Sequence, residues 1–334
     1  MNPTPTRTPA AAAPGRARPH LSRALSALAL AAGLLAAGPV SAAPTVNSAW
    51  VATWDLCGQD CYVISDSAGG VASGGDLVID QSMPKNSGVR GAMSLDFDAA
   101  QGRLRSSTQV RALVDQLAAP DTLSWDRMLF FASNQVHFDD QLVVDHDGFG
   151  FMKIVVRTTG SLHQQGQIIE APISYADVSQ LNRLIVDAEV AGIDRGGFTE
   201  LIQNHYVGLS DGVFAVDESL DVHRLFELIV PWEDDVPVTF SFRYDEVMQY
   251  MVDGVDASRV EMSGENRFGH TLELFADVYD SAGNWLQGVT VGSSEGIGYA
   301  SLGPDQPGTV PEPSSLALAG CAALGWFARR RRRS

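Results

Sequence analysis

The segment GLSDG at residues 208–212 has the spacing G-x-S-x-G, in which a serine hydrolase places its nucleophile. Ser210 would be that nucleophile, and Asp217 and His223 follow it in sequence. Such a serine needs a strand before it and a helix after it. The residues that follow Gly212 are typical of an extended chain instead. We therefore interpret the segment as a glycine-rich turn and assign no catalytic residue.

A second group of chemically capable residues is acidic. Asp139, Asp140, Asp145, His146 and Asp147 lie close together in sequence, and acidic turns are places where Ca²⁺ binds. The twelve-residue calcium loop with its closing glutamate is absent, so a solvated hairpin turn is favoured over a bound Ca²⁺. We expect no metal site and no cofactor, with Ca²⁺ as the alternative. The histidines after the leader are scattered: His137, His146, His163, His205, His223 and His270.

Five tryptophans are candidates for stacking on sugar rings, although most tryptophans of a β-sandwich lie in its core. They are Trp50, Trp54, Trp125, Trp232 and Trp285. A glycoside hydrolase would add a pair of carboxylates at a fixed spatial separation, which the sequence does not reveal.

Cys57 and Cys61 stand in DLCGQDCYV, and no other cysteine or histidine lies close to them. In an exported chain this spacing favours a small-loop disulfide over a zinc site, which needs two further ligands, or over free thiols.

The two ends of the chain are basic, and the part between them is strongly acidic. Four of the 23 basic residues precede residue 43 and five follow residue 310, so residues 43–310 hold 14 basic and 39 acidic residues, a net charge of −25. Such a surface repels nucleic acid, and we expect no nucleic-acid partner.

The interior of the sequence is typical of strands. Phe240, Phe242 and Tyr244 alternate with polar residues in VPVTFSFRY, and Met93, Leu95 and Phe97 do so in AMSLDFD. Turn signals separate such runs, which predicts a mainly β fold, an antiparallel β-sandwich of the jelly-roll or lectin-like kind. Two stretches carry helix signals, residues 108–117 and 174–192, and the second reads equally as strands.

The C-terminus reads VPEPSSLALAGCAALGWFARRRRRS. Residues 314–328 carry no formal charge and predict a short transmembrane helix, with the arginines on its cytoplasmic side. The cytoplasmic anchor would be Arg329, Arg330, Arg331, Arg332 and Arg333.

The N-terminus predicts a signal peptide over residues 1–42. Four arginines precede an apolar run at residues 24–37, and Val40 and Ala42 fit a signal-peptidase site, so cleavage is expected between Ala42 and Ala43. We therefore divide the chain into this signal peptide, a β-sandwich ectodomain (43–300), a linker (301–309) and a C-terminal signal (310–334).

This C-terminal segment resembles the PEP-CTERM sorting signal of Gram-negative envelope proteins, a tail that is also labelled after ice-binding proteins. The matching residues are Val310, Pro311, Glu312 and Pro313, followed by the apolar stretch and the arginines. The resemblance implies cleavage near Pro-Glu-Pro by an exosortase, after export by the Sec machinery and signal peptidase. It also implies a transient inner-membrane anchor, and then an outer-membrane, cell-surface or extracellular location in bacteria that make exopolysaccharide.

Residues 267–300 resemble the closing hairpin of many β-sandwich proteins that carry this tail. Phe268, Gly269 and Thr271 match its strand opening, while Asp280 to Asn284 match its turn. The resemblance implies a fold and no catalytic site. We expect residues 272–278 to pair with residues 286–291, with Leu274 facing the core and with Glu273 and Asp277 facing water.

Two functions remain open from the sequence. The first is a non-enzymatic surface or matrix protein with exopolysaccharide as a candidate ligand. The alternative is a secreted carbohydrate-active hydrolase on the same fold, which requires a groove with exposed tryptophan and two facing carboxylates.

Overall fold

The computed structural model describes residues 44–56, 61–71, 76–82, 87–115, 126–170, 176–208, 215–253 and 259–303. These residues form strands, turns and one short 3₁₀ turn at Ala99–Gln101, and none of them lies in an α-helix. The strands are β1 (Thr45–Leu56), β2 (Cys61–Val71), β3 (Leu77–Ser82), β4 (Gly88–Asp98), β5 (Arg103–Asp115), β6 (Asp126–Val144), β7 (Phe149–Glu170), β8 (Ala176–Val190), β9 (Ile193–Gly208), β10 (Ala215–Glu233), β11 (Val238–Asp253), β12 (Arg259–Asp280) and β13 (Val291–Ser293).

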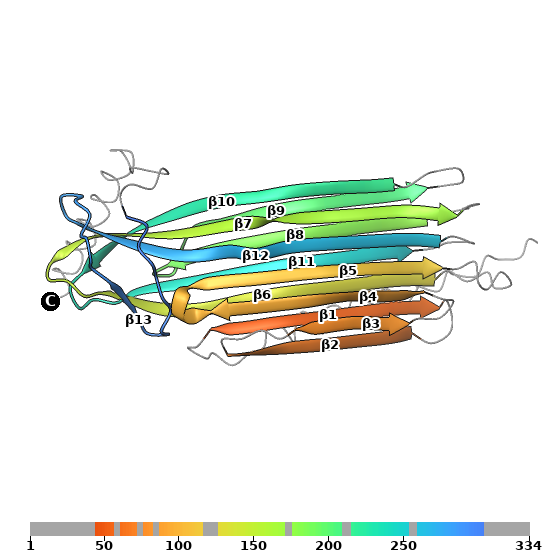
Figure 1. Ribbon diagram of the computed structural model, residues 1–334, viewed down its shortest axis with the longest axis horizontal. Helices are drawn as coiled ribbons and strands as arrows, with labels where there is room; N and C mark the ends of the chain where they lie inside the picture. The colour runs from red at the N-terminus through yellow and green to blue at the C-terminus, as the bar shows by residue number, and fades with distance from the viewer. Residues whose placement is uncertain are drawn as a thin grey trace, which may run out of the picture. The chain divides into compact units, whose positions relative to one another are not determined.

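The strands form two antiparallel sheets that pack face to face. The first sheet has the order β2-β1-β6-β11-β8-β9, with β13 paired to β6, and the second has the order β10-β7-β12-β5-β4-β3. Their long strands run in nearly the same direction (Figure 1). Between β5 and β12 the chain repeatedly crosses from one sheet to the other, which is the Greek-key connection of a jelly roll. The predicted antiparallel β-sandwich is therefore confirmed.

The alternating side chains build the core as expected from a period of two. Met93, Leu95 and Phe97 of β4 are buried between the sheets. Phe138 of β6 packs on Phe242 of β11 with ring centroids 5.2 Å apart.

A polar layer lies between two apolar clusters of this core. Glu246 is 1% exposed, and its Oε2 accepts hydrogen bonds from Ser106 Oγ and Tyr244 OH. Asn134 of β6 donates a hydrogen bond from Nδ2 to Thr108 Oγ1 of β5 at 3.0 Å. These contacts tie the two sheets together by polar bonds as well as by apolar packing.

The helix signal at residues 108–117 is wrong, and for residues 174–192 the alternative of strands is correct, because both stretches form strands within the described residues. Val110, Ala112 and Val114 of β5 are buried at alternate positions. In β8, Leu184 and Val186 face the core in the same way. Tertiary burial of alternate residues therefore outweighs the local helix preference.

Candidate functional site: a pocket at the C-terminal end of the sandwich

The segment that follows β12 begins with the turn predicted at Asp280–Asn284. Asp280 Oδ1 accepts hydrogen bonds from the backbone N–H groups of Ala282 and Asn284, both at 2.8 Å. Hydrogen bonds from the side chain and backbone of Asn284 lower the pKa of the Asp280 carboxyl. Gly283 has a φ of 85°, which glycine adopts without strain.

Beyond this turn the chain does not form the predicted hairpin arm. Leu286 N donates to Val278 O at 2.8 Å, but residues 286–290 form no strand. The chain then crosses to the first sheet, where β13 pairs with the end of β6. It returns to β12 at Ala300, whose carbonyl accepts from Ala276 N at 3.0 Å. The expected pairing of residues 272–278 with residues 286–291 is therefore correct only next to the turn.

Asp140 holds this closing segment, residues 285–303, to the first sheet. The carboxylate is 1% exposed and faces inward from β6. Oδ2 accepts from Ser293 Oγ at 2.7 Å and from Tyr299 OH at 2.9 Å, while Oδ1 accepts from Ser294 Oγ at 3.2 Å and Glu295 N at 3.3 Å. Four donors thus stabilise a buried charge that has no cation beside it in these contacts.

Asp277 holds the same segment to the second sheet. Its Oδ1 accepts from Ser301 Oγ at 2.5 Å and from Gly303 N at 3.0 Å. The sequence predicts that Asp277 faces water, and this is wrong, because the residue is 1% exposed. Asp277 does point outward from the sandwich, as its position in the strand requires. It is buried because the closing segment packs over it.

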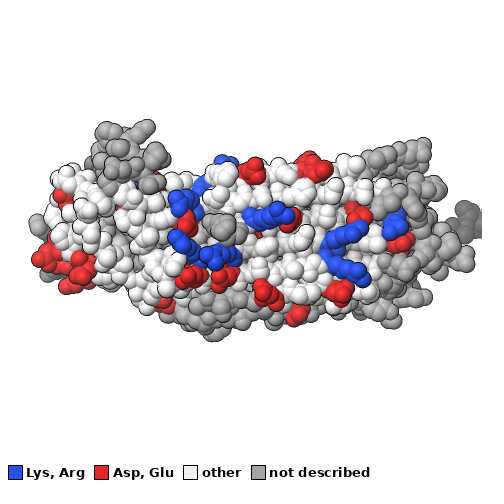
Figure 2. All heavy atoms as spheres, viewed as in Figure 1, with Lys and Arg blue, Asp and Glu red and all other residues white. Residues whose placement is uncertain are grey.

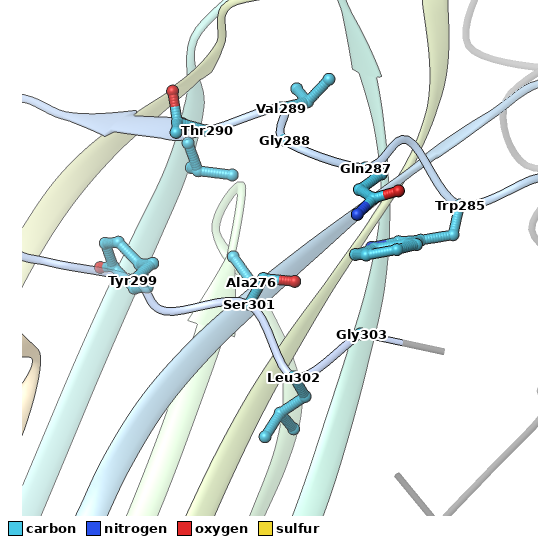
Figure 3. A pocket seen from close by; sticks show the side chains of 11 residues that line it. Ala276, Trp285, Gln287, Gly288, Val289, Thr290, Tyr299, Ser301, Leu302 and Gly303 are labelled. Atoms are coloured by element: carbon cyan, nitrogen blue, oxygen red, sulfur yellow. The ribbon is translucent and has the colours of Figure 1, made fainter. Parts of the chain in front are cut away.

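The closing segment and Ala276 of β12 line an open pocket of about 440 Å³. Figure 3 shows the Trp285 indole and the Gln287 amide reaching inward from the same stretch of chain, with Tyr299 and Ser301 on the returning stretch. The other lining residues are Gly288, Val289, Thr290, Val291, Leu302 and Gly303.

The pocket lining is neutral. None of its eleven residues is an aspartate, glutamate, histidine, lysine or arginine. Burial, followed by the charge of Asp140, raises the pKa of the Tyr299 phenol well above its usual value of 10.0. At neutral pH this phenol is therefore a hydrogen-bonding group and neither an acid nor a base. The lining offers an aromatic face, apolar walls and the amide and hydroxyl groups of Gln287, Thr290 and Ser301.

The candidate tryptophans divide into two kinds. Trp50 and Trp232 are 3% and 2% exposed and belong to the core, so they offer no face to a ligand. Trp285 lines the pocket and is partly exposed. Trp125 and the side chain of Trp54 lie outside the described residues.

Ser210 also lies outside the described residues, but the sheet register brings another serine next to a histidine. Ser219 Oγ lies 2.7 Å from His163 Nδ1, and Asp217 Oδ1 lies 3.8 Å from His163 Nε2. The three side chains stand on the outer face of two paired strands, where Ser219 and His163 are direct cross-strand partners. Ser219 lies within a continuous strand and not on a strand-to-helix turn, so this arrangement lacks the nucleophile elbow of an α/β-hydrolase.

The acidic cluster proposed as a Ca²⁺ alternative does not assemble. Asp139 and Asp140 are neighbours in β6 and therefore point to opposite faces, and Asp139 accepts a hydrogen bond from Ser241. Asp145, His146 and Asp147 are exposed in the β6–β7 turn. Within the described ranges, no three His, Cys, Asp or Glu side chains are placed to hold a metal ion.

Basic side chains on the face seen in Figure 2 lie next to acidic ones and form no separate basic patch. In the second sheet, Glu273 pairs with both Arg103 and Arg157. Sequence reasoning missed these pairs because they join residues far apart in sequence.

Several predicted sites lie outside the described residues. They are the sorting residues Val310–Pro313, the arginines 329–333, the cleavage site at Ala42 and Ala43, the transmembrane segment 314–328, and Cys57. Cys61 begins β2, but its side chain is not among those described, so the disulfide stays a prediction. In the described part of the chain, no helix is long and apolar enough to cross a membrane.

The described part of the chain is thus a β-sandwich with a neutral pocket at the end from which the C-terminal residues leave. Residues 309–333 match the family model of the PEP-CTERM protein-sorting motif. The chain therefore carries a PEP-CTERM sorting motif at its C-terminal end, and this motif implies export and processing by an exosortase. No curated protein and no solved structure matches the chain.

Proposed function

We propose that this protein is an exported, non-enzymatic surface or matrix protein that binds neutral saccharide units of a polysaccharide in its end pocket. Export proceeds through the Sec machinery and signal peptidase, and an exosortase then removes the membrane segment near Val310–Pro313. The mature protein acts at the outer membrane, at the cell surface or in the extracellular matrix.

The observation that carries the saccharide proposal is the lining of the pocket. An aromatic face next to amide and hydroxyl groups suits a sugar ring, whose apolar face stacks while its hydroxyls exchange hydrogen bonds. Trp285 supplies the aromatic face, and Gln287, Thr290 and Ser301 supply the polar groups. The lack of charged lining residues favours a neutral sugar over an acidic one.

The position of the pocket fits processing at the sorting motif. Its last lining residue is Gly303, and the matched motif begins at residue 309. Cleavage near Pro311 therefore leaves all eleven lining residues on the mature protein. A site built into this end also lies next to the part of the chain that is attached to the membrane before cleavage.

The alternative of a glycoside hydrolase gains no support from this pocket. Such an enzyme needs two carboxyl groups on opposite sides of the bond that it cleaves. None of the residues that line the pocket is an acid, and Glu295 of the closing segment is not among them. Asp140 and Asp277 are buried in hydrogen bonds that hold this segment in place.

A glycan array with the exported protein tests the proposal. We expect binding to neutral glycans and loss of most of this binding in Trp285→Ala. Phe149→Ala is a matched control, because Phe149 is an aromatic residue that is 54% exposed and lies outside the pocket lining. Binding that survives in Trp285→Ala, or that is lost equally in Phe149→Ala, would place the ligand elsewhere. Release of free sugar from a bound glycan would favour the hydrolase instead.

A further inference from the structure

Lys153 is an unusual residue in this chain. The sequence contains two lysines, Lys85 and Lys153, against 21 arginines. Lys153 points outward from β7, yet it is only 7% exposed. Nearly all basic side chains of this protein are therefore guanidinium groups. Lys153 is instead an amine, and it is buried on the outer face of the second sheet.

Two carboxylates flank this amine on the neighbouring strands. Lys153 Nζ lies 3.6 Å from Glu227 Oε1 on β10. On the other side, Asp277 of β12 is the direct cross-strand partner of Lys153. Cβ atoms of such partners lie about 4.5–5.5 Å apart. In this structure Nζ pairs with Glu227, and a change of rotamer in the flexible lysine stem would turn it to the Asp277 carboxyl carbon.

The two oxygens of Asp277 differ in their surroundings. Oδ1 accepts hydrogen bonds from Ser301 Oγ and Gly303 N, at 2.5 and 3.0 Å. Oδ2 is buried and has no hydrogen-bond partner. The first oxygen therefore has two donors that can stabilise negative charge on it, as an oxyanion hole does, while the second is free to leave.

The surroundings of this carboxyl exclude water. Phe275 precedes Asp277 by two residues on the same face of β12 and is 7% exposed. Residues 301–303 lie over Asp277 through the hydrogen bonds given above. A site from which water is excluded also protects a newly formed amide from hydrolysis.

We propose that Lys153 and Asp277 join in an intramolecular isopeptide bond. A proton passes from the Lys153 ammonium group to Asp277, and the neutral Nζ attacks Cγ of the resulting carboxylic acid. Ser301 Oγ–H and Gly303 N–H hold the negative charge that develops on Oδ1. Glu227 takes a proton from the attacking nitrogen and passes it to Oδ2, which leaves as water. One amide and one water form from one amine and one carboxyl group, and Glu227 is regenerated.

Peptide mapping of the exported protein tests this bond directly. Trypsin does not cleave after an acylated lysine, so we expect residues 128–157 to remain as one peptide, joined to the peptide that begins at Phe268. The joined species should be lighter than the sum of the two peptides by one water. Recovery of residues 128–153 as a free peptide in the major species would overturn the proposal and leave an ion pair in its place.

Three variants assign the roles. Lys153→Arg keeps the positive charge without a reactive amine and should abolish the joined peptide. Glu227→Gln should slow or abolish its formation in freshly synthesised protein. Glu261→Gln is the matched control, because Glu261 pairs with Arg111 on the same face of the sheet, and here the joined peptide should persist. A joined peptide formed at the normal rate in Glu227→Gln would remove Glu227 from the reaction.

Discussion

At the scale of single residues, Asp140 and Asp277 hold the closing segment, residues 285–303, against the two sheets. Each is 1% exposed, and together they accept six hydrogen bonds from residues 293–303. A hydrogen bond to a charged group contributes about 1.5–3 kcal/mol, whereas a buried carboxylate without donors is strongly destabilising. Asp140 therefore makes the position of the closing segment depend on a residue 153 positions before Ser293, whereas Asp277 lies 24 positions before Ser301.

Three buried tyrosines lead to a prediction on alkaline stability. Burial raises the pKa of Tyr244, Tyr250 and Tyr299 well above 10.0. As the pH rises through 10.0, these tyrosines ionise in the unfolded chain while they stay protonated in the folded one. The unfolded state then binds fewer protons, so the free energy of unfolding falls with rising pH.

Melting temperatures on either side of pH 10.0 check this expectation. The melting temperature should decline above pH 10.0, and the decline should be smaller in Tyr299→Phe, which removes one of the three phenols. Phenolate absorbance should appear together with unfolding. A melting temperature that does not change across pH 10.0 would contradict the assigned burial.

At the scale of elements, β12 shows what alternation predicts and where it fails. Leu272, Leu274 and Val278 face the core as expected. Asp277 has the expected direction but not the expected exposure, because a strand pattern does not indicate whether another segment covers its outer face. The turn at Asp280 was predictable from its residue types. The departure after Leu286 was not, because it depends on pairing with β6.

The facing of β12 can be tested by three substitutions. Leu274→Asp places an unpaired carboxylate in the core and should cost several kcal/mol. Glu273→Lys loses the ion pairs with Arg103 and Arg157, at up to about 1 kcal/mol each. Gln109→Lys, on the exposed face of β5, should be nearly neutral. Thermal melts should rank the three in this order, and an equal loss in all of them would refute the register.

At the scale of the whole molecule, the sorting motif leads to a prediction about the mature C-terminus. The motif at residues 309–333 implies exosortase processing. Mass spectrometry of protein released from the cell surface should find a C-terminus near Val310–Pro313. Mature surface protein that retains Arg329–Arg333 would show that cleavage does not occur there. Protein from cells without the exosortase is the control and should keep these arginines.

The sandwich and the sorting motif were predictable from sequence, whereas the pocket was not. Period-two patterns and turn residues act locally and therefore appear in the sequence. The pocket joins residues 276 and 285–303, and its shape depends on Asp140, more than 130 residues before Gln287. Of the residues that line the pocket, only Trp285 was a candidate from the sequence, where it was one of five tryptophans. The Lys153–Asp277 pair likewise becomes visible only through the register of β7 and β12.

The dependence of the closing segment on Asp140 also has a consequence for incomplete chains. The ribosome makes the N-terminal end first, so the residues that line the pocket are among the last of the described residues to be made. Asp140 and Asp277 accept their hydrogen bonds from donors that lie between residues 293 and 303. A chain that stalls or is cut before this point lacks the segment that builds the pocket. A formed pocket therefore requires a chain that is intact almost to the start of the sorting motif at residue 309.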